Sequence, residues 1–303
     1  MCRAVLVLAL LLTTACGGGE EEPRTPPAEP PREIEVDASS TLYGFVGDTA
    51  GNPVEGVVVS DGFQCVATDA GGVYEMKRNA AAEYVYYSVP AEFKIRTGHD
   101  GYPDFYVRLD TSQQKIRQDF TLERLAGVER NFRLICIGDP QINEASHAVR
   151  FKEEAGREIR EYAASAGVPC YGITLGDHVN NKWTLFTNMV VALQPEQTGV
   201  PVFATIGNHD HEFPTANEKE ARAKYESYFG PVDYSFNRGD VHVVSMDNVI
   251  HSCKASADYE GGFTAAQYAW LKQDLSFVPK DKMVILCVHI PFRGGWGTNS
   301  AHA

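Results

Sequence analysis

Side chains able to do chemistry gather at the end of residues 200–210, VPVFATIGNHD. Seven residues rich in Val, Ile and Phe predict a buried strand, and Gly207 follows it as a turn residue. Asn208, His209 and Asp210 then supply an amide, an imidazole and a carboxylate, which are groups that bind metals or carry protons. Because open α/β sheets bind their ligands at the carboxyl ends of strands, we expect an active-site rim here.

Three other apolar runs end in residues of the same kind. FRLICIGD ends in Asp139, with Gln141 two positions later; YGITLGD ends in Asp177, and MVILCVHIP carries His289 near its end. A single strand followed by Gly-Asp is a common turn, but four such ends in succession predict one shared rim. Carboxylate oxygens together with amides and imidazoles suit paired divalent cations such as Mn, Fe, Zn or Co.

The elements that position these residues are predicted from residue 131 onward, where strands alternate with helices. We expect helices over residues 147–166, 183–193 and 264–277, the last with Thr264 as its N-cap, and a hairpin over residues 234–248. This alternation predicts an α/β fold with a largely parallel sheet.

An earlier region, residues 38–125, has a different pattern of apolar and turn residues. Short strands of period two, interrupted by Gly, Asn, Asp and Pro, predict a small all-β sandwich in which Asp61 and Asp69 are turn residues. GNPVEGVVVSDG and TDAGGVYEM resemble carboxypeptidase-regulatory-like domains, most closely the version fused in front of calcineurin-like phosphoesterases. We expect a spacer or binding role for this domain, and its sequence does not decide between them.

The four strand ends resemble the calcineurin-like metallophosphoesterase family over residues 132–290, which implies an αββα sandwich domain over residues 130–303. The resemblance implies five metal ligands: Asp139 and Gln141 for one cation, Asp177 as the bridge between both, and Asn208 and His289 for the other. It further implies that His209 donates a proton to the leaving oxygen and that Asp210 orients it.

Two departures from the family pattern affect these expectations. Many members have Asp-x-His where this chain has Asp139-x-Gln141, so a neutral amide oxygen is expected to bind the first cation more weakly. The family's final Gly-His-x-His block is also missing before Ala303, and His302 does not replace it. We therefore expect the sequence to be a truncated copy of a longer protein, with activity that depends on the missing ligands.

Composition and the N-terminal sequence limit the partners that the protein can have. The 303 residues are 44% hydrophobic with a net charge of −13, which argues against binding to a nucleic-acid backbone.

The N-terminal sequence resembles a lipoprotein signal, with Arg3, an apolar run and Cys16 in succession. The resemblance implies that residues 1–15 are removed and Cys16 is lipidated, and we expect residues 16–37 to form a disordered tether. The alternative is ordinary secretion with cleavage near Ala15. Either way we expect export, to the periplasm or cell surface, with membrane contact through the lipid alone.

Other residues carry weaker expectations. His178 follows Asp177 and is interpreted as a solvated loop histidine, with contact to substrate as the alternative. His211 and Glu212 are interpreted as loop-surface residues, and His242 and His251 as structural. Arg293 either grips a substrate phosphate or is a plain surface arginine. Three cysteines in apolar runs are expected to be buried small hydrophobic residues: Cys136, Cys170 and Cys287.

The leading functional hypothesis is an exported, metal-dependent phosphoesterase that hydrolyses phosphomonoesters or phosphodiesters through a water activated by two metals. One alternative is a cell-surface binding protein whose hydrolase domain is inert. Another is a metallohydrolase for other esters. The sequence does not specify the substrate, the metal or the oligomeric state.

Overall fold

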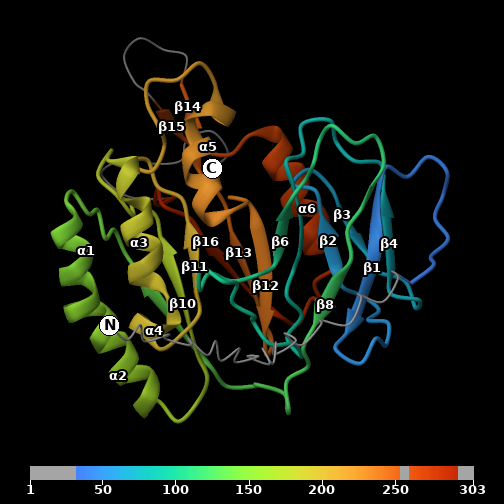
Figure 1. Ribbon diagram of the computed structural model, residues 1–303, viewed down its shortest axis with the longest axis horizontal. Coiled ribbons are helices and arrows are strands. Elements are labelled where there is room, and N and C mark those ends of the chain that lie inside the picture. The colour runs from blue at the N-terminus through green and yellow to red at the C-terminus, as the bar shows by residue number, and fades with distance from the viewer. Residues whose placement is uncertain (1–31, 253–258, 293–303) are drawn as a thin grey trace, which may run out of the picture. The chain divides into compact units, whose positions relative to one another are not determined.

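Residues 42–122 form short strands, as the period-two pattern of the sequence predicts. The computed structural model describes residues 32–252 and 259–292 (Figure 1). Two four-stranded sheets occupy this region. The first contains β1 (Leu42–Asp48), β4 (Val73–Met76), β7 (Ile116–Arg117) and β8 (Phe120–Leu122). The second contains β2 (Val58–Ser60), β3 (Cys65–Ala67), β5 (Tyr84–Tyr87) and β6 (Tyr106–Arg108).

A parallel sheet in the order β11-β10-β9 comes next and brings three of the chemistry-bearing strand ends together. Its strands are β9 (Arg133–Ile137), β10 (Cys170–Leu175) and β11 (Val202–Thr205). Thr174 pairs with Ile137 and Leu175 with Thr205, so the three carboxyl ends lie at one edge. Cys170 and Cys287 are buried as expected, but Cys136 is exposed because β9 is the edge strand of this sheet.

The fourth strand end belongs to a different sheet, ordered β12-β13-β16. Its strands are β12 (Tyr234–Arg238), β13 (Val241–Ser245) and β16 (Met283–Cys287). The first two form the expected hairpin, and β16 pairs parallel to β13, with Cys287 opposite Ser245. The strand–helix alternation predicts a single, largely parallel sheet, and this is corrected to two sheets, whereas the resemblance to an αββα sandwich already implied two sheet layers. A small hairpin, β14 (Val249–His251) with β15 (Tyr259–Gly261), follows β13.

Helices occur where the sequence predicts them, and the described residues contain two more. The first runs through α1 (Ala145–Phe151), a π-helical turn (Lys152–Gly156) and α2 (Arg157–Ser165). A 3-10 turn (Trp183–Leu185) leads into α3 (Phe186–Leu193) and the short α4 (Pro195–Thr198). Thr264 caps α6 (Ala265–Ser276) as expected, through a reciprocal bond with Gln267. One of the two unpredicted helices is α4, and the longer is α5 (Glu218–Phe229), which begins at an Asn217 cap.

Aromatic packing joins the β-rich region to the α/β region, so that the described residues from Ile34 onward form one compact unit. Phe105 of the β-rich region lies 5.7 Å from Phe203 and 4.9 Å from Tyr234, measured between ring centroids. Polar contacts cross as well: Trp270 Nε1 of α6 donates to Ser60 Oγ at 3.0 Å. Among the described helices, none combines the length and apolar character that a membrane span requires.

Candidate metal centre and active site

Asp177, directly after β10, is the hub of the candidate site. Its side chain is almost fully buried, and its two oxygens contact three of the other predicted residues. Oδ1 accepts a hydrogen bond from the His209 backbone N–H at 2.9 Å and lies 3.3 Å from His289 Nε2. Oδ2 accepts from Gln141 Nε2 at 2.6 Å. A carboxylate in this central position can reach two neighbouring cations at once.

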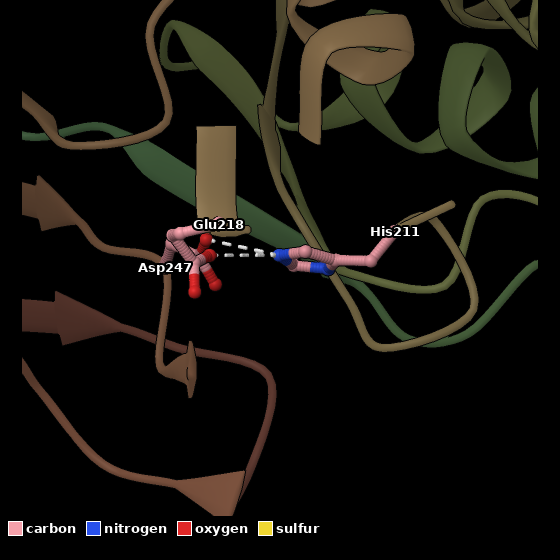
Figure 2. Close-up of side chains that lie close together, drawn as sticks. All are labelled: His211, Glu218 and Asp247. Carbon is pink, nitrogen blue, oxygen red and sulfur yellow. Dashed lines mark hydrogen bonds and ion pairs between the residues drawn. The ribbon is translucent and has the colours of Figure 1, made fainter. Parts of the chain in front are cut away.

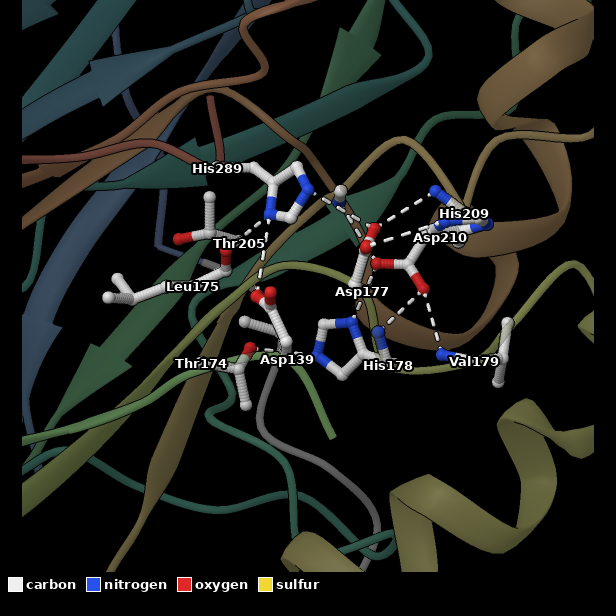
Figure 3. Close-up of polar contacts among 12 residues, drawn as sticks. Asp139, Thr174, Leu175, Asp177, His178, Val179, Thr205, His209, Asp210 and His289 are labelled. Atoms are coloured by element: carbon white, nitrogen blue, oxygen red, sulfur yellow. Dashed lines mark hydrogen bonds and ion pairs between the residues drawn. The ribbon is translucent and has the colours of Figure 1, made fainter. Parts of the chain in front are cut away.

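His289, from the second sheet, completes the cluster. Its Nδ1 lies 2.9 Å from the Leu175 carbonyl oxygen, an acceptor, and therefore carries a hydrogen. Its Nε2 lies 2.9 Å from Asn208 Oδ1 and faces Asp177. Asp139 is more exposed and places Oδ1 3.8 Å from His289 Nδ1. Figure 3 shows these two side chains facing each other. The structure thus links four of the five residues predicted to bind metal by direct contacts, and places the fifth, Asp139, beside His289 alone.

The backbone at these residues is held in unfavourable conformations. Asp139, Gln141 and Asp177 have φ angles of 40°, 39° and 55°, in the left-handed region that side chains other than glycine rarely adopt. Each such residue costs on the order of 1–3 kcal/mol and persists only where the surrounding structure enforces it. Strain concentrated on three residues of one cluster is typical of a functional site.

Two glycines allow the cluster to be this tight. A Cβ atom at Gly176 would lie 2.6 Å from His289 Nδ1, and one at Gly207 would lie 3.0 Å from Asp177 Cγ and nearer still to Asp177 Oδ1. Real Cβ atoms do not approach that closely. Gly176 and Gly207 therefore do more than turn the chain. Only a residue without a Cβ leaves room for His289 beside Gly176 and for Asp177 beside Gly207.

The electrostatics of the cluster call for a positive charge. Burial opposes ionisation of Asp177, but hydrogen bonds from His289, the His209 backbone and Gln141 outweigh it and lower the carboxyl pKa. Burial likewise disfavours a charged His289, yet the hydrogen bond and charge of Asp177 raise its pKa to about 9. A proton on His289 thus balances the site in the absence of metal. A divalent cation bound to the same oxygens and nitrogen would supply that charge, so the donor set fits.

His209 and Asp210, the predicted catalytic pair, do not contact each other through their side chains. The His209 side chain is 32% exposed, with Nε2 4.0 Å from Asp177 Oδ2. Its Nδ1 has no hydrogen-bond partner among the described residues. Asp210 is wholly buried, so the expectation that it orients His209 is corrected.

Asp210 instead fastens the loops that carry the cluster. Its Oδ1 accepts from the backbone N–H groups of His178 and Val179 at 2.8 and 3.2 Å, and its Oδ2 accepts from Gly207 N–H at 3.0 Å. Oδ2 also lies 2.9 Å from His178 Nδ1, while His178 Nε2 contacts Thr174 Oγ1 at 2.7 Å (Figure 3). Asp210 is therefore a positioning residue that ties the loop after β10 to the loop after β11.

Two histidines expected at the loop surface are buried. His178 is stacked 4.7 Å from Phe229, between ring centroids, because α5 covers this loop. His211 is fully buried and contacts Asp247. Both were missed because their partners are 30 or more positions away in the sequence.

Other predicted residues have simpler outcomes. His242 is structural as expected: its Nε2 lies 2.7 Å from Asp274 Oδ2. Glu212 is half-buried, and its backbone N–H donates to the Ala221 carbonyl. Arg293 and Cys16 lie outside the described residues.

Comparison with known proteins gives partial matches to one kind of enzyme. Residues 40–125 match the family model described as "N terminal of Calcineurin-like phosphoesterase". Purple acid phosphatase 23 of Arabidopsis thaliana is 27% identical over 149 residues, 44% of this chain and 30% of the relative. Purple acid phosphatase 18 of the same plant is 28% identical over 141 residues, 43% of this chain and 29% of the relative. The matches thus span less than a third of either relative, and the chain is similar to calcineurin-like phosphoesterases and purple acid phosphatases.

Proposed function

We propose that this protein is a metal-dependent phosphoesterase that hydrolyses phosphomonoesters or phosphodiesters. The observation that carries the proposal is the convergence of Asp177, Asn208 and His289. Asn208 Oδ1 lies 2.9 Å and Asp177 Oδ1 3.3 Å from His289 Nε2. The similarity to purple acid phosphatases supports it, because those relatives are named as phosphatases.

Five residues would hold two divalent cations, with Asp177 shared: Asp139, Gln141, Asp177, Asn208 and His289. When bound, the two cations would neutralise charge on the phosphoryl group and lower the pKa of a bound water to near 7. Phosphate esters resist anionic nucleophiles, so positioning and charge neutralisation supply most of the catalysis. Mn, Fe, Zn and Co all suit this mixture of oxygen and nitrogen donors.

His209 would protonate the leaving oxygen. It is the most exposed imidazole of the cluster, and its backbone is held next to Asp177, because its own N–H donates to that carboxylate. A general acid of this kind contributes about 10²–10⁴ in rate. Asp210 would hold the loop in place without touching the substrate, since it is fully buried.

Two substitutions test the proposal with a chromogenic phosphate ester and measured metal content. Asp177→Ala is expected to abolish hydrolysis together with the binding of the two cations at the Asp177 site. His209→Ala is expected to keep the metal and lose turnover, most severely for poor leaving groups. His147→Ala, on the exposed face of α1, is the control and should match the parent protein.

Three results would contradict the proposal in different ways. Loss of metal in His209→Ala would make this residue a ligand. A parent protein without metal or EDTA-sensitive turnover would favour the binding protein. Turnover of other esters that phosphate and vanadate do not inhibit would favour a different metallohydrolase.

Export and anchoring are proposals of their own. The lipoprotein-type signal before Cys16 supports lipidation, and the β-rich region, with its resemblance to carboxypeptidase-regulatory-like domains, would then hold the enzyme unit away from the membrane. Labelling with a radioactive fatty acid in a bacterial host tests this. Cys16→Ala should lose the label, and a label retained in this variant would contradict the assignment.

A further inference from the structure

Three side chains that the proposed reaction does not use face one another behind the loop carrying Asn208 and His209. They are His211, Glu218 and Asp247, and one ligand atom from each lies within 4.8 Å of the other two. His211 Nε2 is 3.1 Å from Asp247 Oδ2 and 3.6 Å from Glu218 Oε1 (Figure 2). His211 and Asp247 are buried, and Glu218 opens the first turn of α5.

The imidazole of His211 is oriented as in a metal-binding histidine. Its Nδ1 lies 2.9 Å from the Gly207 carbonyl oxygen, which only accepts hydrogen bonds, so Nδ1 carries a hydrogen. Nε2 therefore faces the two carboxylates. Histidines that bind metals almost always donate their other ring N–H to a carbonyl or carboxylate in this way.

One carboxylate oxygen of the cluster lacks a hydrogen-bond partner. Glu218 Oε2 accepts from the His251 backbone N–H at 2.6 Å. Glu218 Oε1 is buried and makes no hydrogen bond to any described residue, and its 3.6 Å separation from His211 Nε2 is too long for one. Buried oxygens are normally satisfied, so this one points to a ligand that would occupy the space between the three side chains.

The charges around the cluster are also unbalanced. Four carboxylates act on Arg222: Glu218, Glu226, Asp233 and Asp247. These four carboxyl groups face only two basic side chains among the described residues, Arg222 and His211, so acidic groups outnumber basic groups around the cluster. A cavity of about 220 Å³ is lined in part by Glu218, Arg222 and Asp247, and so reaches two of the three residues of the cluster.

We propose that His211, Glu218 and Asp247 bind a third divalent cation of the first transition row, distinct from the pair at Asp177. One imidazole nitrogen and two carboxylate oxygens form a donor set that such ions accept. Its role is structural: it fastens the end of the Gly207–His211 loop to α5 and to the segment after β13. The loop that presents Asn208 and His209 is thereby fixed from behind.

Metal counting with Co²⁺ tests the proposal on the full chain, after chelation and dialysis. We expect the parent protein to bind three equivalents, Asp247→Asn two, Asp177→Ala one, and the double variant none. Equal cobalt content in Asp177→Ala and in the double variant would overturn the third site. The two variants that are compared, Asp177→Ala and the double variant, both lack the predicted bridge. The comparison therefore holds whether or not the parent protein binds a pair of cations at Asp177.

A second substitution covers the case in which Asp247→Asn does not fold. Glu218→Gln changes a side chain that is 29% exposed, and in an Asp177→Ala background it should raise the Kd for Co²⁺ at least about 10-fold. Glu220→Gln is the matched control on the same helical turn, because Gln can still accept from the Ala216 backbone N–H. An unchanged Kd in Glu218→Gln would contradict the proposal, as would an equal loss in the control. Such results would leave His211 as an imidazolium paired with Asp247.

Discussion

Gly207→Ala tests whether the cluster depends on the close approach of the two loops. The new Cβ would lie 3.0 Å from Asp177 Cγ and would overlap Asp177 Oδ1 and its backbone nitrogen. Because nonbonded atoms are in comfortable contact at about 3.5 Å, the carboxylate has to move by roughly 1 Å. A displacement of that size at a reacting centre costs about 10² in rate. We therefore expect Gly207→Ala to lose about 100-fold in kcat/KM for a chromogenic phosphate ester and to bind metal more weakly.

Gly138→Ala is the matched control for this prediction. Gly138 precedes Asp139 as Gly207 precedes Asn208, but a Cβ at Gly138 meets no atom within 4 Å. Hydrolysis and metal titration should be within about twofold of the parent protein, since no ligand has to move. Equal behaviour of the two alanine variants, whether both active or both inactive, would refute the packing argument. Thermal unfolding of both variants checks that the fold is retained.

Three further predictions concern stability. Asp210→Asn should lower the free energy of unfolding by about 2–4 kcal/mol, because the carboxylate accepts from three backbone N–H groups, and urea titration measures this. A loss below about 0.5 kcal/mol would contradict its positioning role. Burial raises the pKa of Glu226 to about 7, so its stabilising contribution is present at low pH and is lost between about pH 4.5 and 7. Relative to Glu226→Gln, the parent protein should lose about 1–3 kcal/mol over that range, and parallel pH profiles would contradict this. Trp270→Phe removes the donor to Ser60 Oγ and should cost about 1 kcal/mol by the same titration, whereas no change would show that this bond contributes nothing.

The sequence predicted the local features of the fold and site well. Gly-Asp and Gly-Asn after apolar runs placed Asp139, Asp177 and Asn208 at strand ends, and the register of β9, β10 and β11 brings those ends to one edge. Thr264 predicted a helix N-cap that the structure confirms, and the structure adds Gln267 as its reciprocal partner. Each of these inferences rests on residues close together in the chain.

Long-range contacts could not be predicted in the same way. The partner of Asp210 is His178, 32 positions earlier, and the partner of His211 is Asp247, 36 positions later. The helix α5 that helps to bury both histidines is rich in charged residues, so its apolar stripe is weak in the sequence. Asn217 before Glu220 was the available signal, a helix cap followed three residues later by Glu.

The central claim is that Asp139, Gln141, Asp177, Asn208 and His289 hold a pair of divalent cations. Anomalous diffraction from crystals grown with Mn²⁺ measures this most directly. We predict two peaks, roughly 3.5–4 Å apart, on either side of the Asp177 carboxylate. Crystals with manganese peaks elsewhere in the protein and none beside Asp177 would contradict the account.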